Sequence, residues 1–88
     1  MITKKFFLDD TIEYRNLLGQ YHREDGPAIE WHNGRKSWFI NNKRHREDGP
    51  AIEYSDGSKS WYLNDINYTE DQYQEELIKI KLKKLKWL

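Results

Sequence analysis

The chain has 88 residues, with 15 basic and 15 acidic side chains, no cysteine and a mean hydropathy of −1.10. This length allows one domain with a small core, and the 15% of aromatic residues indicates a folded chain. The balanced charge favours no class of partner, and the lack of cysteine excludes disulfides, thiolate zinc sites and a cysteine nucleophile. No segment has the roughly 20 apolar residues of a membrane helix, and we expect no signal peptide at the N-terminus, because its apolar run is short and ends in two acids. We therefore expect a cytoplasmic protein with no membrane partner.

One unit of the sequence occurs twice. The motif His-Arg-Glu-Asp-Gly-Pro-Ala-Ile-Glu begins at His22 and again, 23 residues later, at His45. The same offset relates residues beyond the motif, namely Gly34 and Gly57, Trp38 and Trp61, and Asn41 and Asn64. A period in the twenties is typical of stacked supersecondary units, none of which buries its apolar face alone. Residues 1–68 therefore divide into a degenerate unit, 4–21, and two full units, 22–44 and 45–67.

The first unit in chain order is the degenerate one. Its residues 9–11 take the place of the turn but include no glycine. Strict transfer of the repeat pattern places Glu13 and Arg15 on the core face, whereas a shift of one residue places Ile12 and Tyr14 there. A modified terminal unit is typical of a capping repeat.

Each full unit predicts a β-hairpin. Asn33 with Gly34 and Asp56 with Gly57 favour a two-residue type I′ turn between strands at 28–32, 36–40, 51–55 and 58–63. Such a turn places Ile29 opposite Trp38. Alternation then assigns to the core face Ile29, Trp31, Trp38 and Ile40, followed by Ile52, Tyr54, Trp61 and Leu63. Phe39 and Tyr62 fall on the opposite, mostly solvated face.

Residues 69–88 predict an amphipathic helix. Thr69 and Gln72 form a capping box at its start. Apolar residues recur at a spacing of three to four residues, at Tyr73, Leu77, Ile78, Leu82, Leu85 and Trp87 or Leu88. We expect this helix to lie across the apolar face of the sheet. The predicted fold is mainly β with one C-terminal helix (α+β), an antiparallel meander of about three hairpins with the helix packed on its apolar face.

The repeated motif is rich in ionisable side chains but matches no catalytic or metal-binding pattern. Each loop holds one histidine, and equivalent loops lie about 10 Å apart, too far to share a metal ion. The serines have no nucleophile-elbow sequence, and there is no phosphate-binding glycine loop. We therefore predict a non-enzymatic protein with no catalytic residues, no cofactor and no metal. The structural interpretation of the motif is that its arginine and acids pair between neighbouring units.

Two sets of residues are candidates for binding. Aromatic residues and arginines carry most of the energy at protein interfaces, so we expect a target protein to contact Arg23, Phe39, Arg46 and Tyr62. The lysines of the helix are either its solvated side or a surface for nucleic-acid phosphates, with a tryptophan that stacks on a base. The second interpretation assigns nucleic-acid binding to Lys79, Lys81, Lys83, Lys84, Lys86 and Trp87.

The repeated unit resembles a known family. Asp-Gly-Pro-Ala, an aromatic residue, Asn/Asp-Gly and then Trp-aromatic-aliphatic-Asn, with a step of 23 residues, resembles the MORN-like repeats. The variant in question is found in antitoxin-like bacterial proteins and in small proteins of phages and large viruses. The resemblance spans residues 12–68 and leaves the lysine-rich helix outside. It implies an array of β-hairpins that binds other molecules and is not an enzyme.

We accordingly predict a small binding protein that neutralises a macromolecular target, such as a toxin or a defence factor. It would act as an antitoxin-like protein or a phage counter-defence inhibitor does. The alternative is an RNA-binding protein that acts through the lysine-rich helix, and an RNA-bridged inhibitor combines the two. A third interpretation is a small-molecule sponge. Open edge strands also allow the sheet to pair into a homodimer.

Overall fold

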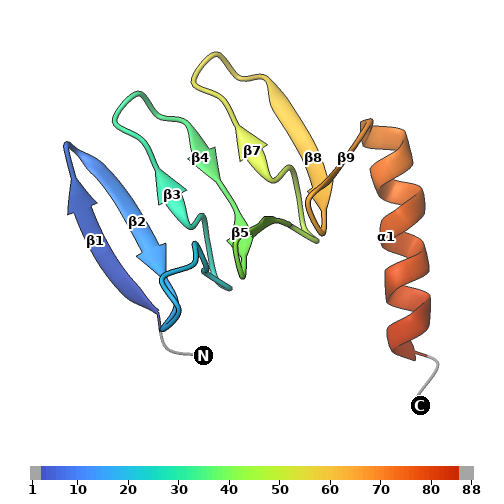
Figure 1. Cartoon of the computed structure of the whole chain (residues 1–88). Helices are drawn as coiled ribbons and strands as arrows, with labels where there is room; N and C mark the ends of the chain where they lie inside the picture. Colours follow the sequence, from blue (N-terminus) through green and yellow to red (C-terminus); the bar gives the residue numbers. More distant parts are fainter. Residues whose placement is uncertain (1–2, 86–88) are drawn as a thin grey trace.

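The structure is a row of antiparallel strands that ends at a helix (Figure 1). It is a computed structural model that describes residues 3–85. The strands of the main sheet follow the order β1 (Lys4–Leu8), β2 (Thr11–Arg15), β3 (Ile29–Glu30), β4 (Lys36–Ser37), β7 (Ile52–Glu53), β8 (Lys59–Leu63) and β9 (Ile66–Tyr68). β5 (Phe39–Ile40) pairs only with β6 (Lys43–Arg44), and α1 (Glu70–Leu85) follows β9. The predicted class, a mainly β meander with one C-terminal helix, is confirmed.

The turns at Gly34 and Gly57 are one residue longer than the sequence predicts. The N–H of Trp31 donates to the carbonyl of Arg35 at 2.9 Å, so three residues connect the two strands, and the second unit repeats this pattern. Gly34 has a φ of +94° and Gly57 a φ of +89°, as in three-residue loops that a left-handed glycine closes with a bulge. The prediction of a two-residue type I′ turn at Gly34 and at Gly57 is therefore wrong.

Two-residue turns occur instead at positions that lack glycine. Asn41 and Asn42, with φ of +47° and +69°, connect β5 to β6. Asn64 and Asp65, with φ of +51° and +69°, connect β8 to β9 at the equivalent place. Positive φ at both central residues is the mark of a type I′ turn, and asparagine and aspartate tolerate this region best among residues with a side chain.

The longer turns move Trp38 and Trp61 to the face opposite the one predicted. Ile29 pairs with Ser37 and Ser37 with Ile52, so these three side chains form a row on one face. Trp38 follows Ser37, and Trp61 follows the residue that pairs with Ile52, so both lie on the other face. The prediction that Ile29 and Trp38 share a core face is wrong because the pairing is shifted by one residue. We call the side that carries Trp38 and Trp61 the tryptophan face.

The N-terminal hairpin continues both faces. Glu13 pairs with Ile29, is buried, and accepts a hydrogen bond from Arg15 at 2.7 Å. Tyr14 belongs to the tryptophan face, where the guanidinium of Arg23 lies 4.0 Å from its ring centroid. Both sides of β2 are therefore partly covered. The register that places Glu13 inward describes one side, and the register that places Tyr14 inward describes the other.

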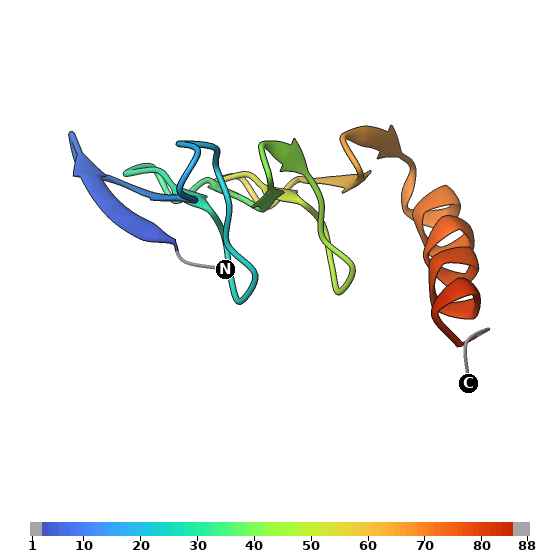
Figure 2. The same ribbon diagram turned by 60° about the horizontal axis from the view of Figure 1, so that its bottom comes forward.

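Both copies of the repeated motif form loops that rise from the tryptophan face. Loop 1 (residues 22–28) precedes β3, and loop 2 (residues 45–51) precedes β7. Figure 2 shows that loop 1, loop 2 and α1 project to the same side of the sheet. The molecule is shallow, with extents of 43 × 32 × 17 Å. The three projections therefore follow one another along the row of strands.

The helix begins as predicted and covers less of the sheet than predicted. Thr69 and Gln72 exchange the two hydrogen bonds of a capping box, at 3.1 and 3.2 Å, which confirms that motif. Tyr73 and Leu77 pack with Leu63 on the apolar side of β8. The other apolar residues expected to cover the sheet, Ile78, Leu82 and Leu85, are exposed. The helix thus caps the last hairpin and leaves the rest of the tryptophan face open.

The buried core is small, and the tryptophans are at its margin. The buried hydrophobic residues are Ala28, Ile29, Ala51, Ile52, Leu63, Tyr73 and Leu77. Trp31 and Trp38 are half-buried, and each is covered by an arginine: Arg35 lies 4.5 Å from the Trp31 ring, and Arg46 lies 3.8 Å from the Trp38 ring. Stacked guanidinium groups therefore take the place of the tryptophan core that the sequence predicts.

Leu77→Ala should destabilise the protein by about 2–5 kcal/mol, because it removes buried methyl groups and leaves a cavity beside Leu63. Leu82→Ala, at a side chain that is 60% exposed, should change stability by less than about 0.5 kcal/mol. Urea denaturation followed by tryptophan fluorescence measures both variants. Equal losses in the two variants would show that α1 does not pack through Leu77.

Gly57→Val should destabilise the second hairpin by about 1–2 kcal/mol, because a β-branched residue is strained at a φ of +89°. A Cβ at Gly57 meets no atom within 4 Å, so the expected loss comes from the backbone conformation and not from a clash. Ser58→Val, at the exposed next residue, is the matched control and should stay within about 0.5 kcal/mol of the parent. Thermal unfolding distinguishes the two, and identical melting temperatures would reject this turn.

Candidate functional site

The arginine of each loop is held by its own unit. In loop 2, Arg46 donates to Asp48 at 2.8 Å, to the carbonyl of Pro50 at 3.0 Å and to Glu53 at 2.7 Å. Its guanidinium then stacks on Trp38 of the preceding unit. The ion pairs of the loop arginine therefore form within its own unit, and its contact with the preceding unit is made by stacking. The interpretation that arginine and acids pair between units is wrong on this point.

Loop 1 repeats these contacts around Arg23. The guanidinium donates to Asp25 at 2.9 Å and to the carbonyl of Pro27 at 3.2 Å, and it lies 3.6 Å from Glu30. The glycine of the motif is required by the same arrangement. A Cβ at Gly26 would lie 2.9 Å from the Cζ of Arg23, and the equivalent glycine of loop 2 has a distance of 2.8 Å. The folded arginine leaves no room for a side chain there.

The histidine of each loop fixes the loop to a type I′ turn. The Nδ1 of His22 accepts from the N–H of Asn41 at 2.9 Å, and that of His45 accepts from the N–H of Asn64 at 3.0 Å. The Nε2 of His45 also lies 2.9 Å from Glu47. These contacts fix the orientation of both loops relative to the sheet, so the space between the loops has fixed walls.

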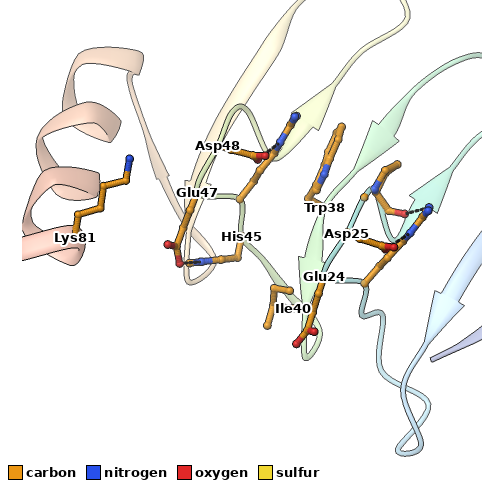
Figure 3. A pocket seen from close by; sticks show the side chains of 12 residues that line it. Glu24, Asp25, Trp38, Ile40, His45, Glu47, Asp48 and Lys81 are labelled. Atoms are coloured by element: carbon orange, nitrogen blue, oxygen red, sulfur yellow. Dashed lines mark hydrogen bonds and ion pairs between the residues drawn. The ribbon is translucent and has the colours of Figure 1, made fainter. Parts of the chain in front are cut away.

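An open groove lies between loop 1 and loop 2, with a volume of about 900 Å³ (Figure 3). Trp38 and Ile40 lie at its floor, and residues 23–27 and 45–48 form its walls. Its rims are acidic: Glu24, Asp25 and Asp48 have side chains that are 70%, 87% and 86% exposed. We call this space the loop groove. The loop groove combines an apolar floor with carboxylates at its rims. This combination suits a partner whose contacting side chains include apolar and basic ones.

α1 contributes two lysines beside the loop groove. Lys84 donates to Glu47 at 2.7 Å, and Lys81 reaches the groove from the far side of loop 2. The hydrogen bonds from Lys84 and, next, from His45 hold the pKa of Glu47 below its ordinary value of 4.5. Glu47 is thus an anchor that ties loop 2 to the helix.

The residues predicted to contact a target protein lie in two separate clusters. Arg23 and Arg46 line the loop groove, although their guanidinium groups are engaged within the loops. Phe39 packs against Tyr21, with ring centroids 5.4 Å apart, and Tyr62 lies 4.4 Å from the guanidinium of Arg44. Backbone hydrogen bonds link the clusters, since the N–H groups of Arg23 and Arg46 donate to the carbonyls of Phe39 and Tyr62. Their role in binding stays a prediction.

The lysines predicted to bind nucleic acid differ in their contacts. Lys79 pairs with Glu76 at 3.0 Å and Lys84 with Glu47, whereas Lys81 and Lys83 are exposed. Lys86 and Trp87 lie outside the described residues.

Sequence reasoning missed the floor of the groove. Trp38 and Ile40 were assigned to the core, and their position depends on a register that the sequence did not reveal. The signal that was available is the repeat itself. Every wall residue of loop 1 recurs in loop 2, which indicates two parallel ridges with a space between them.

Neither a metal centre nor a membrane segment is evident in the described part of the chain. Within residues 3–85, no group of three histidine or acidic side chains is placed to hold a metal ion. Over the same residues, no helix has the length and apolar character needed to cross a membrane.

Comparison with known proteins adds no relative. A scan against protein-family models finds no match for this chain, and searches of the curated proteins and of the solved structures find none either. The MORN-like resemblance of the repeats therefore stays a prediction.

Stability should fall in acid through Glu47. A carboxylate with a depressed pKa in the folded state stabilises that state above its unfolded pKa, and the contribution is lost as pH falls through the folded value. The loss should therefore begin near pH 4.5 and continue below it. It should stay under about 1 kcal/mol, because the Glu47 side chain is 34% exposed. Urea midpoints of the parent and of Glu47→Gln at pH 3 to 7 should converge in acid, whereas Glu75→Gln should follow the parent throughout.

Proposed function

We propose that this chain is a non-enzymatic binding protein that engages a target protein through the loop groove. The observation that carries the proposal is the groove itself, which two copies of one motif build and no described segment fills. Its walls are fixed by internal hydrogen bonds, so little conformational entropy is lost when a partner enters. Its floor combines a tryptophan with an aliphatic side chain, a combination common at the centres of protein interfaces.

The charge of the loop groove favours a protein over a nucleic acid. Glu24 extends into solvent at the rim and would repel phosphates, and the exposed carboxylates of Asp25 and Asp48 leave little net positive charge on the arginines with which they pair. Two of the helix lysines are already paired with glutamates, which reduces the positive charge available to RNA. RNA binding through Lys81 and Lys83 is therefore the second candidate, and their exposure is the observation that supports it.

Target neutralisation remains part of the proposal. A small array of MORN-like repeats with one rigid groove suits an antitoxin-like or counter-defence inhibitor in the cytoplasm, which acts by occupying a target and needs no catalysis. Homodimerisation is compatible with binding of a target in the loop groove. β1 is at the edge of the sheet and exposes Phe7 and Leu8, so a second copy pairing there would leave the loop groove accessible.

Affinity capture with three variant sets tests the proposal. Ile40→Lys with Glu24→Lys alters the loop groove, Lys81→Gln with Lys83→Gln alters the helix, and Phe39→Ala with Tyr62→Ala alters the second cluster. Partner retention should fall at least about tenfold for the groove set alone, and should survive nuclease and high salt.

Circular dichroism of each variant set is the control for folding. Retention that is lost only with the helix set, or only after nuclease treatment, supports RNA binding instead. Retention that is lost only with the Phe39 and Tyr62 set would indicate that the target binds at the cluster that contains these two residues.

A further inference from the structure

Arg35 lies between two aromatic rings that belong to neighbouring repeat units. The Cζ of its guanidinium is 4.5 Å from the ring centroid of Trp31 and 5.2 Å from that of Tyr54. The period of 23 residues makes these rings equivalent, and equivalent positions two strands apart are separated by roughly 10 Å. The two distances together match that separation, so the guanidinium is held between the rings. Its N–H donors point outward in its own plane and are not used by the stacking.

The N–H donors of Arg35 have no acceptor in the part of the chain that the structure describes. The other four arginines also lie over aromatic rings, and each donates to a carboxylate of this chain. The Nε of Arg35 is buried without a partner, so the terminal nitrogens Nη1 and Nη2 are the donors that a ligand can reach. The carboxylate partners of the other arginines are Glu13 for Arg15, Asp25 for Arg23, Asp65 for Arg44 and Asp48 for Arg46.

Arg35 and its two rings lie on the face of the sheet opposite the loops. Trp31 comes two residues after Ile29, and Tyr54 comes two residues after Ile52, so both rings share the face of these two isoleucines. Loop 1, loop 2 and α1 project from the other side, the tryptophan face (Figure 2). None of these three elements covers Arg35 and its rings, and all three side chains are half-buried.

The positive charge at this place comes from Arg35 alone among the nearby cations. Lys36 lies opposite Glu30 and Glu53 in the sheet, and Lys59 lies opposite Glu53, so alternation places both lysines on the tryptophan face. A nucleic acid is held by several cations along one track, whereas a carboxylate needs only one. A carboxylate is planar and accepts two parallel hydrogen bonds from a guanidinium, which makes it the anion that suits this site.

We infer that Arg35, between Trp31 and Tyr54, is a binding site for the carboxylate of an aspartate or glutamate on a partner protein. The carboxylate accepts two parallel hydrogen bonds from Nη1 and Nη2, and apolar side chains beside it contact the exposed parts of the two rings. The rings exclude water from both sides of the guanidinium, which strengthens the ion pair relative to one in open solvent. The site lies on the face opposite the loop groove, so the inference does not depend on the proposed function.

Titration with two short peptides tests this inference. The probe is acetyl-Leu-Glu-Leu-amide, and acetyl-Leu-Gln-Leu-amide has nearly the same shape without the charge. Each peptide is added to the ¹⁵N-labelled full chain, and NMR spectra follow the Nε–H signal of Arg35 and the indole signal of Trp31. Single-stranded oligouridine is titrated in parallel as the polyanion probe.

The glutamate peptide should give saturable shifts of both signals at millimolar concentrations. The glutamine peptide should bind at least about tenfold more weakly, because it cannot form charge-assisted hydrogen bonds. Arg35→Lys should weaken binding of the glutamate peptide by about three- to tenfold, since an ammonium cannot donate two parallel hydrogen bonds, and Arg35→Gln should abolish it. Lys36→Gln removes the same charge from the next residue, on the tryptophan face, and should leave the affinity unchanged. The Trp31 indole reports on all three variants.

Three results would overturn the inference: no shift of the Trp31 indole with the glutamate peptide, equal binding of the two peptides, or equal losses in Arg35→Gln and Lys36→Gln. Saturation by oligouridine at lower concentrations than by the glutamate peptide would also overturn it, and would assign this face to nucleic acid. The comparison of the two peptides uses the parent protein, so it decides the question even where Arg35→Gln fails to fold.

Discussion

The stacking of each loop arginine on an aromatic ring of the preceding unit holds this small protein together. Arg23 lies on Tyr14 and Arg46 on Trp38, and each is fixed from behind by carboxylates and a carbonyl of its own loop. A guanidinium stacked in this way is worth about 0.5–2 kcal/mol, depending on how far it is removed from water. The chain has few buried aliphatic side chains, so these contacts add to the pairing of β2 with β3 and of β4 with β7 in ordering neighbouring units.

The sequence predicted the parts of the fold that depend on local chemistry. The capping box at Thr69 and the positive φ of Gly34 follow from residue types that have few alternatives at those places. The turn length did not follow, because Asn-Gly suits both a two-residue turn and a three-residue loop closed by a left-handed glycine. The change of one residue moved Trp38 to the other face and left Ile29 and Ile52 in the core without the tryptophans.

The candidate site was less predictable, for a related reason. The sequence made Arg23 and Arg46 candidates for contact with a target protein, but it did not show that their donors are used within the loops. Ile40 was assigned to the core by alternation, although it lies on the floor of an open groove. Position in the array decides this difference, since the equivalent Leu63 is covered by α1 and Ile40 is not. A linear pattern contains no information on which copy has a neighbour.

Tyr73 meets Trp61 in the way that the loop arginine of a following unit would, so α1 ends the array without any change in the units before it. Interactions of this kind reach only the nearest neighbour. A 23-residue unit duplicated ahead of Thr69 would therefore meet the same surfaces on both sides. Each duplication adds one loop and one groove, so under the proposed function the number of partner segments held by a single chain scales with the number of units. Valency in this architecture can change by whole-unit duplication, with no redesign of an existing contact.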